Sequence, residues 1–335
     1  MRARPKKLGG GLVLIDKVAV PEVPRVHRTY FGFKARMMPH VLRWSTRGVF
    51  VEAFCGGASL SWTMHRLGRD TLSGDASYLA YLHAAGSVAA PPLPPGWPDL
   101  DADPVEGFAC ALLDGRGPKQ KGALPLTRDA ARWLDGLCTA QAGDLSLMLA
   151  AAKALDCECR AMRFPSWTNK PVGLTALREY VAKWAALVRE AVVPGGRAEA
   201  RHGLAHETLA SRCDFGGGTL YLDPAWPFAD GSTAAAFYSH PARVGEIVAQ
   251  RATPFDFLGT GDHLIYILGL VRTFFERGGQ RVLTATQSTN SPSADELEPS
   301  LFSVARVLDR TTRRVEGGSH GTGFVEDMFT LEAPR

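Results

Sequence analysis

Residues 218–228 read GTLYLDPAWPF and predict a strand followed by a proline-containing turn. Thr219 to Leu222 is a short, apolar, β-favouring run, which predicts a buried strand. Asp223 follows where the strand stops, because the prolines after it cannot continue a strand. In an open parallel sheet, ligands bind at the carboxyl ends of the strands. The Asp223 carboxylate, the Pro224 carbonyl and the Trp226 indole would suit a planar base that carries an amino group, whereas the alternative is an ordinary strand with an Asp-Pro turn.

A second stretch, residues 49–59, predicts an apolar strand that runs into a glycine turn, with a helix over 60–67 after it. Glycines at such a turn let a ligand approach the backbone closely. The next expected strand, 71–74, ends in Asp75, about 20 residues after the glycines, where nucleotide-binding sheets place an acid on ribose hydroxyls. The glycines fit neither the dinucleotide fingerprint nor a P-loop. This pattern favours an adenosine ligand that lacks a pyrophosphate.

Four ordered motifs resemble those of the DNA adenine methyltransferases, the bacterial and phage group that modifies the exocyclic nitrogen of adenine. They are Tyr30-Phe31-Gly32-Phe33-Lys34, Phe50-Val51-Glu52-Ala53-Phe54-Cys55-Gly56-Gly57, Asp75, and Tyr221-Leu222-Asp223-Pro224-Ala225-Trp226. The resemblance covers most of residues 30–333 and is poor between about 86 and 157. Ala53 and Ala225 depart from it, because prolines are usual in one or both of these motifs.

The resemblance implies an α/β fold of the class I S-adenosylmethionine-dependent, Rossmann-like type: a doubly wound, mostly parallel, seven-stranded sheet. An inserted helical region would recognise the DNA target. The expected parts are a basic N-terminal arm over 1–24, a catalytic domain over 25–88 and 193–335, and the inserted region over 89–192.

The resemblance also implies S-adenosyl-L-methionine as the cofactor and a flipped-out adenine as the methyl acceptor. Lys34 would pair with the methionine carboxylate, and Asp75 would accept hydrogen bonds from the ribose. The expected cofactor residues are Tyr30, Lys34, Glu52, Phe54, Cys55, Gly56, Asp75 and Asp223. The expected catalytic residues are Asp223, Pro224 and Trp226, and the expected DNA contacts are Arg160, Asn169 and Lys170.

Other functions stay open at this point. A catalytically inactive DNA-binding homologue and a cytosine-N4 methyltransferase both fit the motifs, because the same groups handle either exocyclic amine. RNA is a less favoured substrate. Double-stranded DNA is the expected partner, a cognate restriction enzyme is a further one that the resemblance allows, and a monomer is expected.

The composition limits the classes of protein to which this chain can belong. The chain has 335 residues, 45% of them hydrophobic, which is ample for a core. No apolar run approaches the ~20 residues of a membrane span, and six cysteines without a Cys-x-x-Cys pair indicate neither a metal site nor a disulfide framework. We therefore expect a reduced, cytoplasmic protein, and the resemblance implies a bacterial or phage-infected cell.

Basic residues are concentrated near the N-terminus, where only Asp16 and Glu22 oppose them before Gly48. They are Arg2, Arg4, Lys6, Lys7, Lys17, Arg25, Arg28, Lys34, Arg36, Arg43 and Arg47. A second cluster comprises Arg306, Arg310, Arg313 and Arg314. A basic arm can track a phosphate backbone, although a solvated tail is an equal alternative for residues 1–20.

Overall fold

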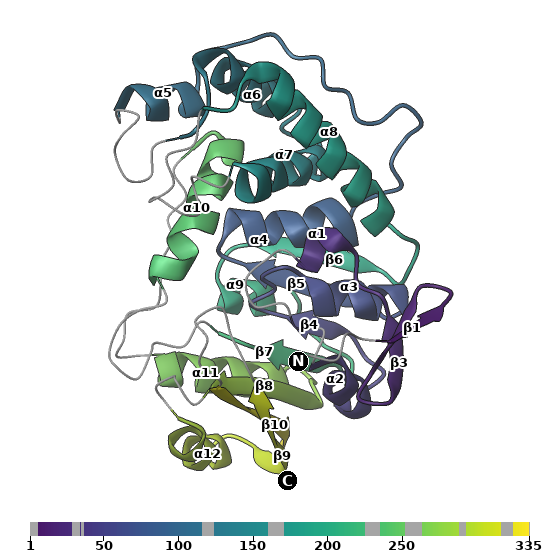
Figure 1. The fold of residues 1–335 in the computed structure, drawn as a ribbon. Coiled ribbons are helices and arrows are strands. Elements are labelled where there is room, and N and C mark those ends of the chain that lie inside the picture. The colour runs from purple at the N-terminus through teal and green to yellow at the C-terminus, as the bar shows by residue number, and fades with distance from the viewer. Residues whose placement is uncertain are drawn as a thin grey trace.

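The computed structural model describes residues 6–28, 34, 37–115, 124–159, 171–224, 235–251, 263–287, 293–315 and 324–334. Its centre is a seven-stranded sheet of order β6-β5-β4-β7-β8-β10-β9 (Figure 1). These strands are β4 (Phe50–Glu52), β5 (Thr71–Asp75), β6 (Ala198–His202), β7 (Thr219–Leu222), β8 (Arg281–Gln287), β9 (Arg306–Val315) and β10 (Phe324–Glu332). The pairs from β6 to β8 are parallel, and β10 is antiparallel to β8 and β9. The predicted α/β class with a mostly parallel, seven-stranded sheet is confirmed.

The strand order reverses next to β4. From β4 the chain moves outward to β5 and β6, and it then returns to β7 on the other side of β4 and moves outward to β8. Such a reversal leaves a crevice at the carboxyl ends of the two central strands, which is where open α/β sheets bind ligands. Glu52 ends β4 and lies beside Tyr221 of β7, so Asp223 follows at the same edge.

Helices cover both faces of the sheet, because successive side chains of a strand point to opposite faces. Val51, Leu220 and Val282 belong to one core, which also contains residues of helices α9 (Ala205–Ala210), α11 (His263–Glu276) and α12 (Ala294–Phe302). Phe50, Tyr221 and Leu283 belong to the opposite core, with residues of α2 (Met38–Trp44) and α3 (Ser59–Arg66).

A helical region lies between β5 and β6 in the sequence and fills the upper part of Figure 1. It follows α4 (Tyr78–His83) and the π-helical segment η2 (Ala84–Val88), and it comprises α5 (Phe108–Gly115), α6 (Arg128–Ala140), α7 (Leu145–Glu158) and α8 (Leu174–Ala191). The alanine-rich sequence predicts a helical pattern over about 130–155, but the structure has two helices there, α6 and α7. The Asp144 side chain accepts a hydrogen bond from the Leu147 amide and so caps a new helix, α7.

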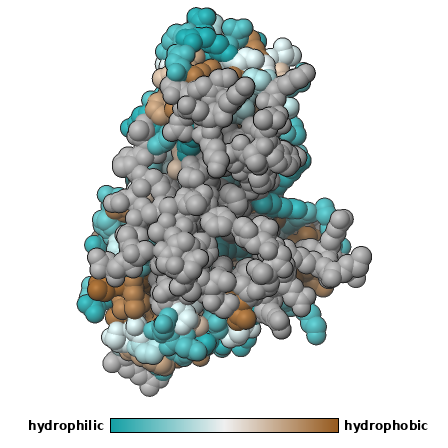
Figure 2. Space-filling view, turned by 60° about the vertical axis from the view of Figure 1, so that its left-hand side comes forward, coloured by the Kyte–Doolittle hydropathy of each residue, from teal (hydrophilic) through white to brown (hydrophobic). Residues whose placement is uncertain are grey.

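Helix α10 (Ala235–Ala249) joins the two parts of the molecule, since it comes after β7 in the chain yet packs against α4, α6 and α7. In Figure 1 it runs from the helical region down towards the sheet. In the space-filling view, hydrophilic side chains cover the top of the helical region (Figure 2).

Residues 6–21, which lie within the expected basic arm over 1–24, form a small sheet. Strands β1 (Lys6–Gly9), β2 (Leu12–Ile15) and β3 (Val18–Pro21) pair antiparallel through two-residue turns. Both residues of each turn have positive φ, Gly10 and Gly11 in one and Asp16 and Lys17 in the other, as tight hairpins require. Val13 and Val20 are buried in the core that contains α2, and this burial holds the sheet on the molecule. A helical turn, α1 (Arg25–Arg28), follows.

The methyltransferase resemblance implies a terminal antiparallel pair of strands over 302–311 and 326–332. The structure confirms the antiparallel pair, but its first strand begins later than 302, because Phe302 ends α12. Three arginines of this hairpin are paired with acids. Arg310 contacts Asp295, Glu298 and Asp327, and Arg306 contacts Glu332. Arg313 contacts Asp16. In the expected basic cluster, Arg306, Arg310 and Arg313 therefore have their charges offset by neighbouring acids.

Within the described ranges, no helix is both long enough and apolar enough to cross a membrane.

Candidate functional site

An ion pair joins the first and last of the predicted motifs. Lys34 Nζ contacts Asp223 Oδ2, and the two side chains keep only 18% and 13% of their surface exposed. Asp223 follows β7 directly, as predicted, and Pro224 after it is buried. The sequence predicted that Lys34 pairs with a cofactor carboxylate, whereas in this structure its ammonium pairs with the candidate catalytic acid.

Glu52 lies beneath this pair at the end of β4 and is 1% exposed. Its Oε2 accepts hydrogen bonds from the Ser61 amide at 3.0 Å and from the Ser61 hydroxyl at 2.5 Å. Burial raises the pKa of Glu52 to about 7, although the Ser61 hydrogen bonds and the charge of Lys34 act in the opposite direction. Glu52 thus ties the end of β4 to the first turn of α3, below the predicted cofactor turn.

Asp75 ends β5 and holds the backbone on both sides of the site. Its Oδ2 accepts from the Gly56 amide at 3.0 Å, and its Oδ1 accepts from the Ser77 amide at 2.9 Å. Burial raises the pKa of Asp75 to about 6, against the effect of these two amides, although part of the residue stays accessible. Each carboxylate oxygen has two lone pairs, so one backbone contact each leaves capacity for further donors.

The residues between Glu52 and α3 form a tight turn with two left-handed residues. Gly56 has φ +48° and Ala58 has φ +51°. Cys55 is buried, and its thiol faces the Ala80 carbonyl at 3.5 Å, so its side chain points into the α4 side of the core. Burial raises the pKa of the Cys55 thiol well above its ordinary value. Cys55 therefore contributes packing beneath the turn.

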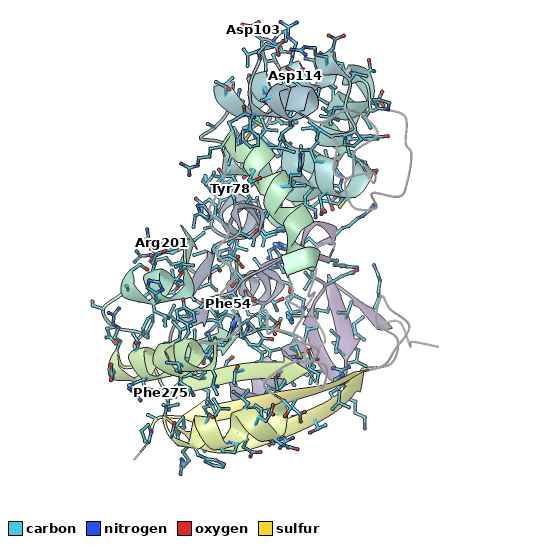
Figure 3. The ribbon with its side chains drawn as sticks, turned by 90° about the vertical axis from the view of Figure 1, so that its left-hand side faces the viewer. Phe54, Tyr78, Asp103, Asp114, Arg201 and Phe275 are labelled. Carbon is cyan, nitrogen blue, oxygen red and sulfur yellow. The ribbon has the colours of Figure 1, made fainter. Side chains whose placement is uncertain are left out.

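Phe54 is half-buried at the same edge and packs against the core that contains α11. In the view of Figure 3 it lies between Tyr78 of α4 above and Phe275 of α11 below. Its ring offers an apolar surface next to the glycine turn.

Several predicted site residues lie outside the described residues. They are Tyr30 of the first motif, Trp226 of the last, and the expected DNA contacts Arg160, Asn169 and Lys170. The departure Ala225 also lies there, whereas the departure Ala53 is described and 1% exposed.

Two residues of the site were missed by the sequence reasoning. Ser61 holds Glu52, and its hydroxyl also accepts from Ser73 at 2.8 Å. His27 contacts the carbonyl of Gly57 at 2.6 Å. A serine in the first turn of a helix after a glycine turn is a weak signal for such a role, and no pattern in the sequence marks His27.

The chemistry of this edge suits a small ligand with an adenosine part and an amino-acid part. A half-buried carboxylate, an ammonium group, an aromatic face and a glycine turn all come to the carboxyl ends of β4, β5 and β7. Among the described residues, no group of three or more His, Cys, Asp or Glu side chains could hold a metal ion. No protein-family model matches this chain, and no curated protein sequence matches it.

Proposed function

We propose that this chain is an S-adenosylmethionine-dependent DNA methyltransferase that modifies the exocyclic N6 amine of adenine. The observation that carries the proposal is that the described parts of four motifs, far apart in the sequence, meet at one edge of the sheet. Lys34, Glu52, Asp75 and Asp223 all lie there, beside the turn at Gly56. These motifs resemble those of the DNA adenine methyltransferases, and the resemblance implies that residues at this edge bind the cofactor and the target base.

The seven-stranded sheet supports the finer fold assignment. A mostly parallel sheet with a final antiparallel hairpin, and with its order reversing beside β4, is what the methyltransferase resemblance implies. The described residues also fit the cofactor. Asp75 would accept from the ribose hydroxyls, Phe54 would pack on the adenosine, and Lys34 would contact the carboxylate. When bound, S-adenosylmethionine supplies an electrophilic methyl group.

Asp223 and Pro224 would orient the base. The lone pair of an adenine amino group is delocalised into the ring, which makes the nitrogen a poor nucleophile. The Asp223 carboxylate and the Pro224 carbonyl would each accept one of its two hydrogens, and this favours a pyramidal nitrogen whose lone pair is available. Fixed acceptors aimed at a centre where positive charge develops are a strong source of acceleration, and alignment of the two reactants adds to it.

The helical region α5 to α8 would contact the DNA duplex. A base inside a duplex hides its amino group, so the target adenine must leave the stack to reach Asp223. Trp226 would stack on the extruded base, a contact worth about 1–3 kcal/mol on the scale of base–aromatic stacking.

Binding and transfer must be measured separately to test this proposal. Calorimetry with S-adenosylmethionine and with a mixed-sequence duplex should show binding of both, and log affinity for the duplex should fall linearly with log salt. Transfer of a labelled methyl group to the duplex should follow. Binding of both without transfer across varied sequences would favour the inactive DNA-binding homologue, and absence of cofactor binding would overturn the proposal.

A further inference from the structure

We propose that His27 is a positioning residue that clamps the glycine turn at the cofactor site from behind. The inference deepens the proposed function and rests on it for the identity of the ligand. The clamp itself does not depend on the proposed function, because the contact between His27 and Gly57 exists in the protein without ligand.

The turn at residues 55–58 needs such a clamp because its backbone is unfavourable. Gly56 at φ +48° is unstrained, but Ala58 at φ +51° carries a Cβ in the left-handed region, where Cβ crowds the following carbonyl oxygen. Ala58 is 0% exposed and caps α3 without a side-chain hydrogen bond. A non-glycine residue stays in this region only where surrounding contacts hold it there.

Two side chains hold the peptide groups of this turn from opposite ends. Asp75 Oδ2 accepts from the amide of Gly56 at 3.0 Å, and His27 Nδ1 lies 2.6 Å from the carbonyl oxygen of Gly57. A carbonyl oxygen can only accept, so Nδ1 must carry the hydrogen and donate. The two contacts come from separate elements, β5 and α1.

The surroundings of His27 fix its ring in one orientation. The side chain is 0% exposed, and its ring lies 6.0 Å from that of Trp62 and 5.8 Å from that of His83. Nε2 faces the Ser87 hydroxyl at 3.4 Å. Burial, assisted by the charge of Lys153, lowers the pKa of His27 to about 4 despite the Gly57 contact. The ring is therefore neutral near pH 7, and its one hydrogen is the one on Nδ1 that Gly57 accepts.

This arrangement connects the cofactor turn to the helical region. Ser87 belongs to η2, and Lys153 belongs to α7. The ring that holds Gly57 is thus packed among residues that lead into the proposed target-recognition helices. A ligand that touches the turn would gain affinity from a backbone already held in its binding conformation.

A matched pair of substitutions separates the clamp from simple packing. An Asn side chain places an N–H near the position of His Nδ1, whereas a Gln side chain places it near Nε2. Both remove the ring, so His27→Asn and His27→Gln should lower the thermal unfolding temperature to a similar degree. Only His27→Asn keeps a donor for Gly57.

Two readouts then decide. By calorimetry, His27→Gln should bind S-adenosylmethionine about tenfold more weakly, the loss expected for one hydrogen bond, and His27→Asn should stay within about threefold of the unmodified protein. In the ligand-free protein, amide hydrogen exchange over residues 56–58 should speed up in His27→Gln and much less in His27→Asn. Equal exchange and equal affinity in the two variants would overturn the clamp. If the unmodified protein bound no S-adenosylmethionine, the proposed function would fail, while the exchange comparison would still decide the role of His27.

Discussion

Lys34 Nζ and Asp223 Oδ2 form an ion pair at the carboxyl edge of the sheet, and both side chains are more than four-fifths buried. One residue precedes β4 and the other follows β7, so the fold alone brings them together. The pair means that Lys34 has two possible partners in the proposed reaction, Asp223 and the carboxylate of the cofactor. If the Lys34 ammonium contacted both carboxylates, it would hold Asp223, which accepts from the base, at a fixed position relative to the cofactor, which donates the methyl group.

Lys34→Met should slow methyl transfer by at least about tenfold, because it leaves the Asp223 carboxylate without its partner in a largely desolvated position. Lys34→Arg keeps the charge and should be milder. Single-turnover transfer with saturating DNA measures the effect. The control is Arg197→Met, which removes an exposed pair with Glu199 beside β6, outside the helical region. Equal rates for Lys34→Met and the control would remove Lys34 from the site.

Asp75→Ala should weaken binding of S-adenosylmethionine by about 1–3 kcal/mol. Two losses contribute, because the ribose hydroxyls lose an acceptor and the Gly56 amide loses the contact that holds the turn. Calorimetry measures the affinity. Glu199→Ala is the matched control, since Glu199 lies on the neighbouring strand β6 and pairs there with Arg197 and Arg201. An unchanged affinity for Asp75→Ala would exclude Asp75 from the cofactor site.

Glu52→Gln should make the stability of the protein less dependent on pH between about 4.5 and 7. Folding raises the pKa of Glu52 from its ordinary 4.5 to about 7, so the folded chain keeps this proton longer than the unfolded chain. Its contribution to stability is therefore fully present below pH 4.5 and is lost as the pH rises to about 7. Glutamine has no proton to lose, and its side-chain oxygen can still accept from Ser61.

Urea unfolding at pH 5 and pH 8 tests this expectation. Between the two pH values the unmodified protein should lose about 1–3 kcal/mol more than Glu52→Gln. His27, whose pKa is lowered to about 4, gives the opposite dependence, because its contribution grows as the pH rises from about 4 to 6.5. Both the unmodified protein and Glu52→Gln contain His27, so its contribution cancels in the difference between them. The same pH dependence in both would show that Glu52 is ionised in the folded state throughout.

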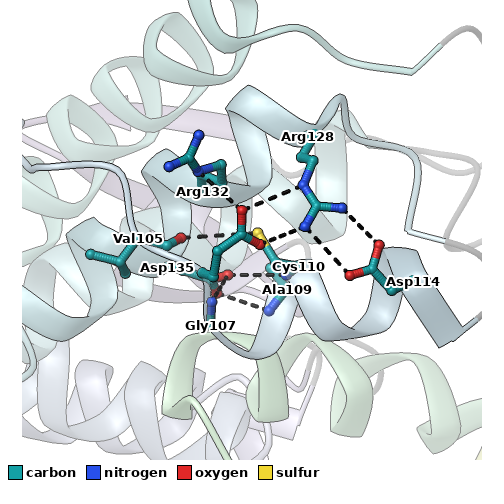
Figure 4. Close-up of polar contacts among 9 residues, drawn as sticks. Val105, Gly107, Ala109, Cys110, Asp114, Arg128, Arg132 and Asp135 are labelled. Atoms are coloured by element: carbon teal, nitrogen blue, oxygen red, sulfur yellow. Dashed lines mark hydrogen bonds and ion pairs between the residues drawn. The ribbon is translucent and has the colours of Figure 1, made fainter.

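Asp135→Ala should destabilise the helical region by about 3 kcal/mol. The buried Asp135 carboxylate accepts from the amides of Gly107, Ala109 and Cys110 (Figure 4). It also accepts from the side chain of Gln250. Its removal takes the acceptor from the amides of Gly107, Ala109 and Cys110, whereas Gln250 keeps the Ile247 carbonyl. Asp114→Ala is the control, because Asp114 pairs with Arg128 on the surface, where ion pairs add little. Similar midpoints of urea unfolding for the two variants would contradict this account.

The sequence could predict the sheet because its strands are short apolar runs that end in turn residues. The strand from Thr219 to Leu222 has the predicted bounds, and Asp75 ends its strand as expected. The N-terminal sheet could not be predicted, because its strands are only four residues long and two of the four residues of β1 are lysines. Only the Gly10-Gly11 turn carried a hairpin signal, since Asp16 and Lys17 are an uncommon pair for such a turn.

The candidate site was predictable in its residues and not in its contacts. Motif spacing indicated Asp75 and Asp223, but whether Lys34 pairs with Asp223 or with a ligand depends on side-chain geometry that no spacing encodes. His27 lies outside every motif. Its contact with Gly57 arises from the packing of α1 against α3 and η2, which is a tertiary property.

The most direct test identifies the modified nucleoside. The protein is incubated with methyl-labelled S-adenosylmethionine and a mixed-sequence duplex, and the digested product is analysed by mass spectrometry. The account predicts N6-methyladenine as the labelled nucleoside. It also predicts that Asp223→Ala slows its formation by at least about 100-fold while the affinity for the cofactor changes little, because the base loses one fixed acceptor. Methylcytosine as the sole product, or full activity of Asp223→Ala, would contradict the account.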